Sequence, residues 1–82
     1  MKEYNNVVND LTLLYNAKNH DYGCSFDKLV EEFGLISVVI RLQDKVNRLK
    51  VLTSEKGVVL DESIEDTLMD IANYAIMAIM RF

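Results

Sequence analysis

The sequence has no proline, no tryptophan, three glycines and one cysteine. Because proline is absent and glycine stands only at positions 23, 34 and 57, few residues would interrupt a helix. The single cysteine, Cys24, excludes an intrachain disulfide and favours a reducing compartment. The scarcity of helix breakers predicts an all-α fold.

Long hydrophobic runs and an excess of basic residues are also missing. No segment approaches the roughly 20 apolar residues that a membrane helix needs, and the start of the chain, residues 1–6, lacks the apolar part of a signal peptide. The formal net charge of −4 argues against a protein that coats nucleic acid, because binding to the phosphate backbone needs a basic face. We therefore expect a cytoplasmic protein with no membrane partner, and we do not expect nucleic-acid binding.

The chain is short and rich in apolar residues. Its 82 residues, half of them hydrophobic, are expected to form one domain over residues 1–82. A chain below about 100 residues buries only a modest share of its surface in a single core. Towards the end of the chain, Ile76, Ile79 and Met80 belong to a segment with almost no polar circumference, which needs to be enclosed on nearly all sides. We therefore predict that homo-oligomerisation, as a dimer or a larger symmetric assembly, completes the fold.

The spacing of apolar residues predicts a compact arrangement of four helices. They are expected over about residues 3–18, 25–33, 35–52 and from residue 61 or 63 onward. Ser25 is expected to cap the second helix and Gly34 to end it. Asp61 or Ser63 is expected to cap the fourth helix, whose first turn is acidic. Residues 19–25 are interpreted as a loop.

The predicted third helix carries its charges in an unusual place. At about 100° per residue, Arg41, Asp44, Lys45 and Arg48 fall within about one third of the helix circumference, between two apolar flanks. Charges with apolar surface on both sides are either paired with a neighbouring helix or directed at a ligand. Because guanidinium groups bind phosphate oxygens well, this group of residues is a candidate phosphate site.

The predicted fourth helix carries a complementary polar line of Asp66, Asp70 and Asn73. If the two long helices pack antiparallel, the basic residues of the third helix would face the two aspartates. In one interpretation this is a buried charge ladder that fixes the register of the helices and binds nothing. In the other, the two lines of residues flank a cleft where acids hold Mg²⁺ and bases hold phosphates, with Tyr74 near one wall.

The stretch from Lys18 to Gly23 offers a base, an amide, an imidazole, an acid and an aromatic ring within six positions. Tyr22 is suited to stack on a nucleobase, and Asp21 to accept a hydrogen bond from a ribose hydroxyl or a base edge. Gly23 would let the backbone come close to a ligand. The alternative is a turn in which Tyr22 packs into the core.

Three segments carry a resemblance to a known family. They are Asp21-Tyr22-Gly23, the pattern Arg41-x-x-Asp44-Lys45-x-x-Arg48-Leu49, and the run from Glu65 to Tyr74. Over about residues 18–80 the chain resembles the family called nucleotide modification associated domain 1, which is found mostly in phages. Its helical layout is more remotely similar to the all-α nucleoside triphosphate pyrophosphohydrolases of the MazG type. Those enzymes bind Mg²⁺ through Glu-x-x-Glu on one helix and Glu-x-x-Asp on another.

The MazG-type metal pattern is incomplete in this sequence. Leu35 stands three residues after Glu32, and Thr67 stands three residues before Asp70, where the pattern has acids. Asp66 is one position away from the second gap, so Asp66, Asp70 and Glu32 are the metal ligands to expect if the protein depends on Mg²⁺. Hydrolysis of a phosphoanhydride needs metal ions to activate water and to neutralise charge. The departures therefore favour binding over catalysis.

Together these observations and the resemblance predict a phage-type protein that binds or sequesters a nucleotide, or a nucleotide-derived signal that the host uses in its defence. The protein is expected to bind this ligand without hydrolysing it and without a cofactor. The predicted nucleotide-binding residues are Lys18, Asp21, Tyr22, Arg41, Asp44, Lys45, Arg48, Asp70, Asn73 and Tyr74. No catalytic residue is predicted. One alternative is an Mg²⁺-dependent nucleotide pyrophosphohydrolase that supports phage nucleotide metabolism or DNA modification. Another is an interaction protein whose apolar last helix docks on a host target.

Overall fold

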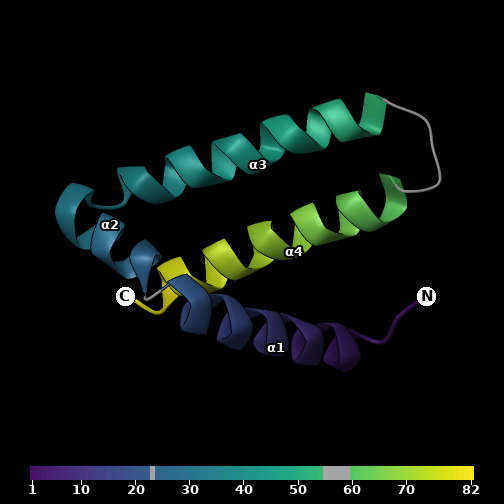
Figure 1. The fold of residues 1–82 in the computed structure, drawn as a ribbon, viewed down its shortest axis with the longest axis horizontal. Helices are drawn as coiled ribbons and strands as arrows, with labels where there is room; N and C mark the ends of the chain where they lie inside the picture. Colours follow the sequence, from purple (N-terminus) through teal and green to yellow (C-terminus); the bar gives the residue numbers. More distant parts are fainter. Residues whose placement is uncertain (23, 55–59) are drawn as a thin grey trace.

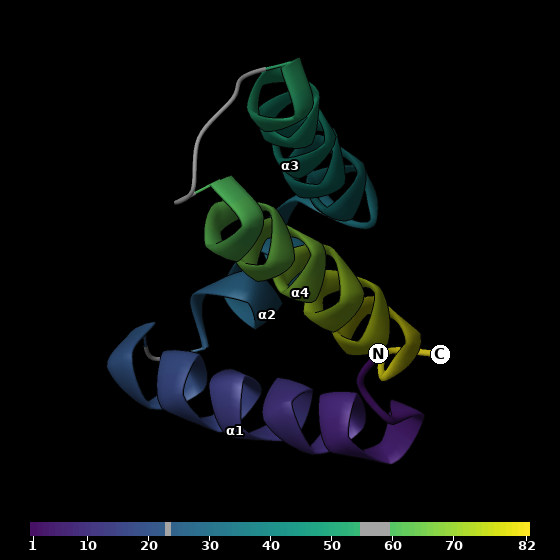
Figure 2. The same cartoon turned by 90° about the vertical axis from the view of Figure 1, so that its right-hand side faces the viewer.

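A computed structural model of the chain describes residues 1–22, 24–54 and 60–82, and the side chains of residues 21, 22 and 60–62 lie outside this description. In the described residues the chain forms four α-helices and no strand, which confirms the predicted all-α fold. The helices are α1 (Tyr4–Tyr22), α2 (Ser25–Phe33), α3 (Ile36–Ser54) and α4 (Leu60–Ile79). α3 and α4 run antiparallel, α4 lies between α3 and α1, and α2 packs against the start of α3 (Figures 1 and 2).

α1 is longer than the sequence predicts. It continues through Tyr22, so the loop expected over residues 19–25 is wrong for residues 19–22. Asn19, His20 and Asp21 each cost only about 0.7 kcal/mol or less relative to alanine in a helix, and none of them is a breaker. Cys24, which precedes α2, has a left-handed backbone with φ of 62°.

α2 begins and ends where predicted, but its expected cap is wrong. Ser25 is the first helical residue, and Cys24 before it makes no side-chain hydrogen bond to the helix. Gly34 ends α2 as predicted, because its φ of 76° leaves the helical region and its N–H donates to the carbonyl oxygen of Val30 at 2.8 Å. The backbone at Gly34 is one that residues with a side chain rarely adopt. This glycine therefore allows the sharp corner between α2 and α3.

α4 starts earlier than predicted. Its first residue is Leu60, so Asp61 and Ser63 lie inside the first turn and neither precedes the helix as a cap. The carbonyl oxygen of Ser63 instead accepts a hydrogen bond from the hydroxyl of the buried Thr67 at 2.8 Å. The start of a helix depends on what packs around it, whereas capping preferences are worth only about 1 kcal/mol.

The hydrophobic core of the described residues is small. Its buried apolar side chains are Leu11, Phe26, Val30 and Val38. α1 is attached to α4 through Leu11, whose carbonyl oxygen accepts a hydrogen bond from Nδ2 of the buried Asn73 at 3.2 Å. Many of the described apolar side chains are instead exposed or only partly buried. None of the described helices combines the length and the apolar character that crossing a membrane requires.

Candidate functional site

A cavity of about 370 Å³ lies where the four helices meet, with each helix contributing to its wall. The lining residues are Tyr15, Lys18 and Asn19 of α1, Ser25 and Phe26 of α2, Arg41 and Lys45 of α3, and Asp70, Asn73, Tyr74 and Met77 of α4. Three of them are cations and one is an acid, so the cavity is positively charged although the whole chain carries a net charge of −4. Its volume falls in the range of about 300–1,000 Å³ that is typical of ligand pockets.

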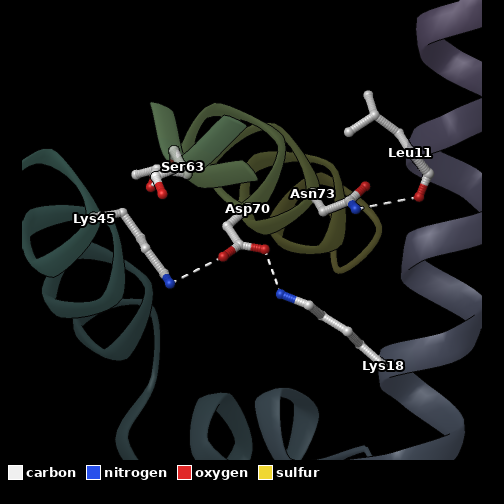
Figure 3. Close-up of polar contacts among 7 residues, drawn as sticks. Leu11, Lys18, Lys45, Ser63, Asp70 and Asn73 are labelled. Atoms are coloured by element: carbon white, nitrogen blue, oxygen red, sulfur yellow. Dashed lines mark hydrogen bonds and ion pairs between the residues drawn. The ribbon is translucent and has the colours of Figure 1, made fainter. Parts of the chain in front are cut away.

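Asp70 connects three helices at the wall of this cavity. Its Oδ1 accepts from Nζ of Lys18 on α1 at 2.5 Å, and its Oδ2 lies 2.9 Å from Nζ of Lys45 on α3 (Figure 3). Burial raises the pKa of Asp70, but the hydrogen bonds and charges of the two lysines together outweigh burial and hold the pKa below its usual value. The predicted contact between the third and fourth helices is thus confirmed for Lys45 and Asp70. Lys18 is a second partner that the sequence did not predict.

Arg41 is held by aromatic rings. Its guanidinium carbon lies 5.7 Å from the ring centroid of Phe26 and 5.7 Å from that of Tyr74. The two rings stack on each other with centroids 5.8 Å apart and planes inclined by 14°. No carboxylate of the described residues lies within ion-pair distance of Arg41. A cation–π contact leaves the N–H donors of a guanidinium able to bind an anion.

A second, more open hollow adjoins the cavity along α3. Its lining residues are Arg41, Asp44, Lys45, Arg48 and Tyr74, of which three also line the cavity. Asp44 and Arg48 are exposed, and neither pairs with an opposite charge in the described part of the chain. All four charged residues of the predicted group therefore line one continuous surface, with three cations and one acid.

Comparison with known proteins assigns a family. Residues 18–82 match the family described as Nucleotide modification associated domain 1. The chain belongs to this family. The matched range begins at Lys18, so of the cavity-lining residues only Tyr15 precedes it. No curated protein and no solved structure matches the chain. The likeness to MazG-type enzymes and the phage context stay predictions.

Of the other predicted site residues, some line the cavity, and the side chains of others lie outside the described part of the chain. Asn73 and Tyr74 line the cavity, although Asn73 also holds α1 through its hydrogen bond to Leu11. Asp21 and Tyr22 belong to the last turn of α1, but their side chains lie outside the described part, as does Gly23 entirely, so their predicted roles stay predictions.

The predicted metal ligands are not gathered in one place. Glu32 and Asp66 are exposed and line neither the cavity nor the adjoining hollow. Among the described residues, no three histidine, cysteine, aspartate or glutamate side chains form a group that could hold a metal ion. Both carboxylate oxygens of Asp70 already face lysine ammonium groups, which a magnesium ion would have to displace. As arranged here, Asp70 does not fit a magnesium ligand.

Phe26 is one of the cavity-lining residues, with Tyr15 and Ser25, that the sequence did not predict. Its side chain is only 4% exposed, lies against Tyr74 and Arg41, and lines the cavity. The spacing of Phe26 and Val30 along α2 is typical of the buried side of a helix, and both are indeed buried. No local pattern indicates that the ring would stack on a tyrosine from a distant helix.

Proposed function

We propose that this protein binds a nucleotide or a nucleotide-derived molecule in the cavity and the adjoining hollow, and does so without hydrolysing it. The observation that carries the proposal is a positively charged cavity in an acidic chain, with Lys18, Arg41 and Lys45 set against the single acid Asp70. A concave surface with excess positive charge favours an anionic ligand, and these side chains are good donors to phosphate oxygens. The description of the family, which names nucleotide modification, supports a nucleotide as that anion.

The two spaces fit different parts of a nucleotide. The open hollow has Arg41, Lys45 and Arg48 on its wall and would take the phosphates. The cavity offers the ring of Tyr74 and the thioether of Met77 as apolar contacts for a base. Its amide side chains could donate hydrogen bonds to the base edge or the sugar and accept them from these groups, whereas the carboxylate of Asp70 could only accept.

The arrangement of Asp70 supports binding over hydrolysis. The carboxylate is held by Lys18 and Lys45, which leaves it poorly placed to hold a magnesium ion beside the phosphates. A protein that retains its ligand intact acts by sequestering it, and it needs no cofactor to do so. In the phage context that the resemblance implies, the sequestered molecule would be a nucleotide signal of host defence.

Calorimetric titration and thermal shift with a panel of nucleotides test the proposal. The panel holds nucleoside mono-, di- and triphosphates, cyclic dinucleotides and ADP-ribose, with inorganic phosphate as the minimal probe. We expect at least one nucleotide, at 100 times its dissociation constant, to raise the free energy of unfolding by about 2.7 kcal/mol. Arg48→Ala should lose most of this stabilisation. Lys50→Ala is the matched control, because it removes the same charge from an exposed position of α3 that lines neither space.

Chromatography of the nucleotide after incubation with excess Mg²⁺ separates binding from catalysis. Recovery of intact nucleotide agrees with the proposal. Release of pyrophosphate, abolished by Asp70→Ala, would replace it with the pyrophosphohydrolase hypothesis. Failure of every nucleotide in the panel to bind would leave the interaction-protein hypothesis in its place.

A further inference from the structure

The single chain exposes more surface than a compact protein of its mass. Its accessible surface is 6285 Å², whereas the scaling law for folded monomers gives about 5,000 Å² for 9.4 kDa. Its radius of gyration of 13.8 Å also exceeds the value of about 12 Å expected for a compact domain of 82 residues. The surplus of about 1,300 Å² is of the size that each subunit buries in an obligate homodimer.

Helical spacing shows which side of α3 carries exposed apolar residues. Lys45 lines the cavity, and Leu42 lies about 60° further round the helix and packs against the core. Val39 lies about 60° further still, on the side away from the cavity, and its side chain is 56% exposed. Val46 lies on the same side of the helix and is also exposed. Leu35, in the turn directly before α3, is exposed as well, and its carbonyl oxygen accepts from the N–H of Val39.

α4 repeats this order on the same side of the helix pair. Met77 lines the cavity, Tyr74 lies about 60° further round and packs against the core, and Leu68 lies about 120° beyond Tyr74 and is exposed. Ala75 and Ile79 are exposed close to the line of Leu68. The antiparallel register set by the Lys45 and Asp70 contact brings the exposed apolar residues of the two helices level with each other.

We call these six exposed residues the back face of the α3–α4 pair. They are Leu35, Val39, Val46, Leu68, Ala75 and Ile79. All six are exposed in the single chain, so no described helix covers the back face. α2 lies beside the α3–α4 pair, and α1 crosses on the far side of α4 from α3 (Figure 2). These six residues are uncharged, and exposed Lys50 lies about 20° round α3 from the line of Val39. A contact between two copies of this face therefore keeps the two Lys50 ammonium groups at its edge, in water.

We propose that a second copy of this chain docks on the back face about a two-fold axis, so that two α3–α4 pairs form a four-helix core. A two-fold axis places the same patch of both subunits in contact, and an apolar patch is complementary to itself. The cavities then open on the outer sides of the dimer, and each is built by a single subunit. This inference does not rest on nucleotide binding.

Sedimentation velocity on the full chain, without nucleotide, tests the inference with a matched pair of variants. Val39→Glu and Ile40→Glu change adjacent residues of α3 that are 56% and 58% exposed, with the same change of charge. The two side chains point about 100° apart, and Ile40 lines a different apolar hollow between α2 and α3. For the wild type and Ile40→Glu we expect a molar mass from sedimentation of twice the chain mass of 9.4 kDa. For Val39→Glu we expect the mass of one chain.

A second pair tests the α4 half of the same face. Leu68→Glu should dissociate the dimer, whereas Ile76→Glu, of similar exposure but about 80° away round the helix, should leave it intact. Far-ultraviolet circular dichroism checks that each variant keeps its helices. If Val39→Glu loses them, Leu68→Glu and the milder Val39→Gln decide the question.

Two outcomes overturn the proposal. One is a wild type that stays monomeric at the highest soluble concentration. The back face would then be a binding site for a different protein. The other is a dimer that Ile40→Glu dissociates and Val39→Glu preserves, which would assign the interface to the hollow between α2 and α3. A back-face dimer that binds no nucleotide would contradict the proposed function and leave this inference standing.

Discussion

Asp70 makes the stability of the fold depend on pH. Its pKa in the folded chain is lowered, so its contribution is fully present above the unfolded value of about 3.9 and is lost as the pH falls through the folded value. We expect Asp70→Asn to lower the free energy of unfolding by about 1–2 kcal/mol at neutral pH. The difference from wild type should vanish in strong acid, where Asp70 is protonated in both states.

Urea denaturation measured from neutral pH into strong acid checks this expectation. Asp66→Asn is the control, because Asp66 is an exposed acid of the same helix that makes no ion pair with a described residue. A destabilisation by Asp70→Asn that stays constant over the whole range would contradict it, since the loss would then not come from the carboxylate charge.

The contacts of single residues were only partly predictable from the sequence. Helical spacing correctly indicated that Arg41, Lys45 and Arg48 share one surface, because the period of a helix alone decides which residues are neighbours round it. It could not indicate that Arg41 would lie over the rings of Phe26 and Tyr74, or that Lys18 would reach Asp70. Those contacts join residues from different helices, and they depend on how the helices pack.

Gly34 fixes the corner between α2 and α3. Its backbone, with φ of 76° and ψ of −165°, lies in a region that is essentially restricted to glycine. A methyl group at this position would meet no atom within 4 Å, so Gly34→Ala isolates the cost of backbone strain, which is about 1–3 kcal/mol. Urea denaturation should show a loss of this size.

A substitution elsewhere in α2 provides the comparison for Gly34→Ala. Glu31→Ala changes an exposed residue of the helix and should alter the free energy of unfolding by no more than about 0.5 kcal/mol. Equal effects of the two substitutions would mean that the corner relaxes into another backbone conformation. Gly34 would then be replaceable.

At the scale of whole helices, the sequence predicted the four helices correctly but placed some of their ends wrongly. Apolar spacing and Gly34 were sufficient to place α2 and to indicate the long α3 and α4. The end of α1 was wrong because residues 19–25 were interpreted as a loop. The start of α4 was wrong because Asp61 or Ser63 was assigned as its cap. Capping and propensity differences of about 1 kcal/mol per residue are easily overridden by packing.

At the scale of the molecule, a small core accompanies an apolar surface. Only a short set of described side chains is buried, while apolar residues of α3 and α4 remain exposed on the back face. If a second copy covers this face, as we propose, a chain with so little buried area of its own gains much of its stability from that contact. Folding and association should therefore be linked, which goes further than the oligomer that composition alone predicted.

Linked folding and association make the melting temperature depend on chain concentration. Each tenfold rise in concentration favours the dimer by about 1.4 kcal/mol, and for a folding unit of about 160 residues this corresponds to roughly 3–5 °C. Differential scanning calorimetry over a hundredfold range should show this rise for the wild type. The monomeric Val39→Glu chain should melt at a lower temperature that does not change with concentration. A wild type with a constant melting temperature would contradict this expectation. It would show that the single chain, with its accessible surface of 6285 Å², is stable without a partner.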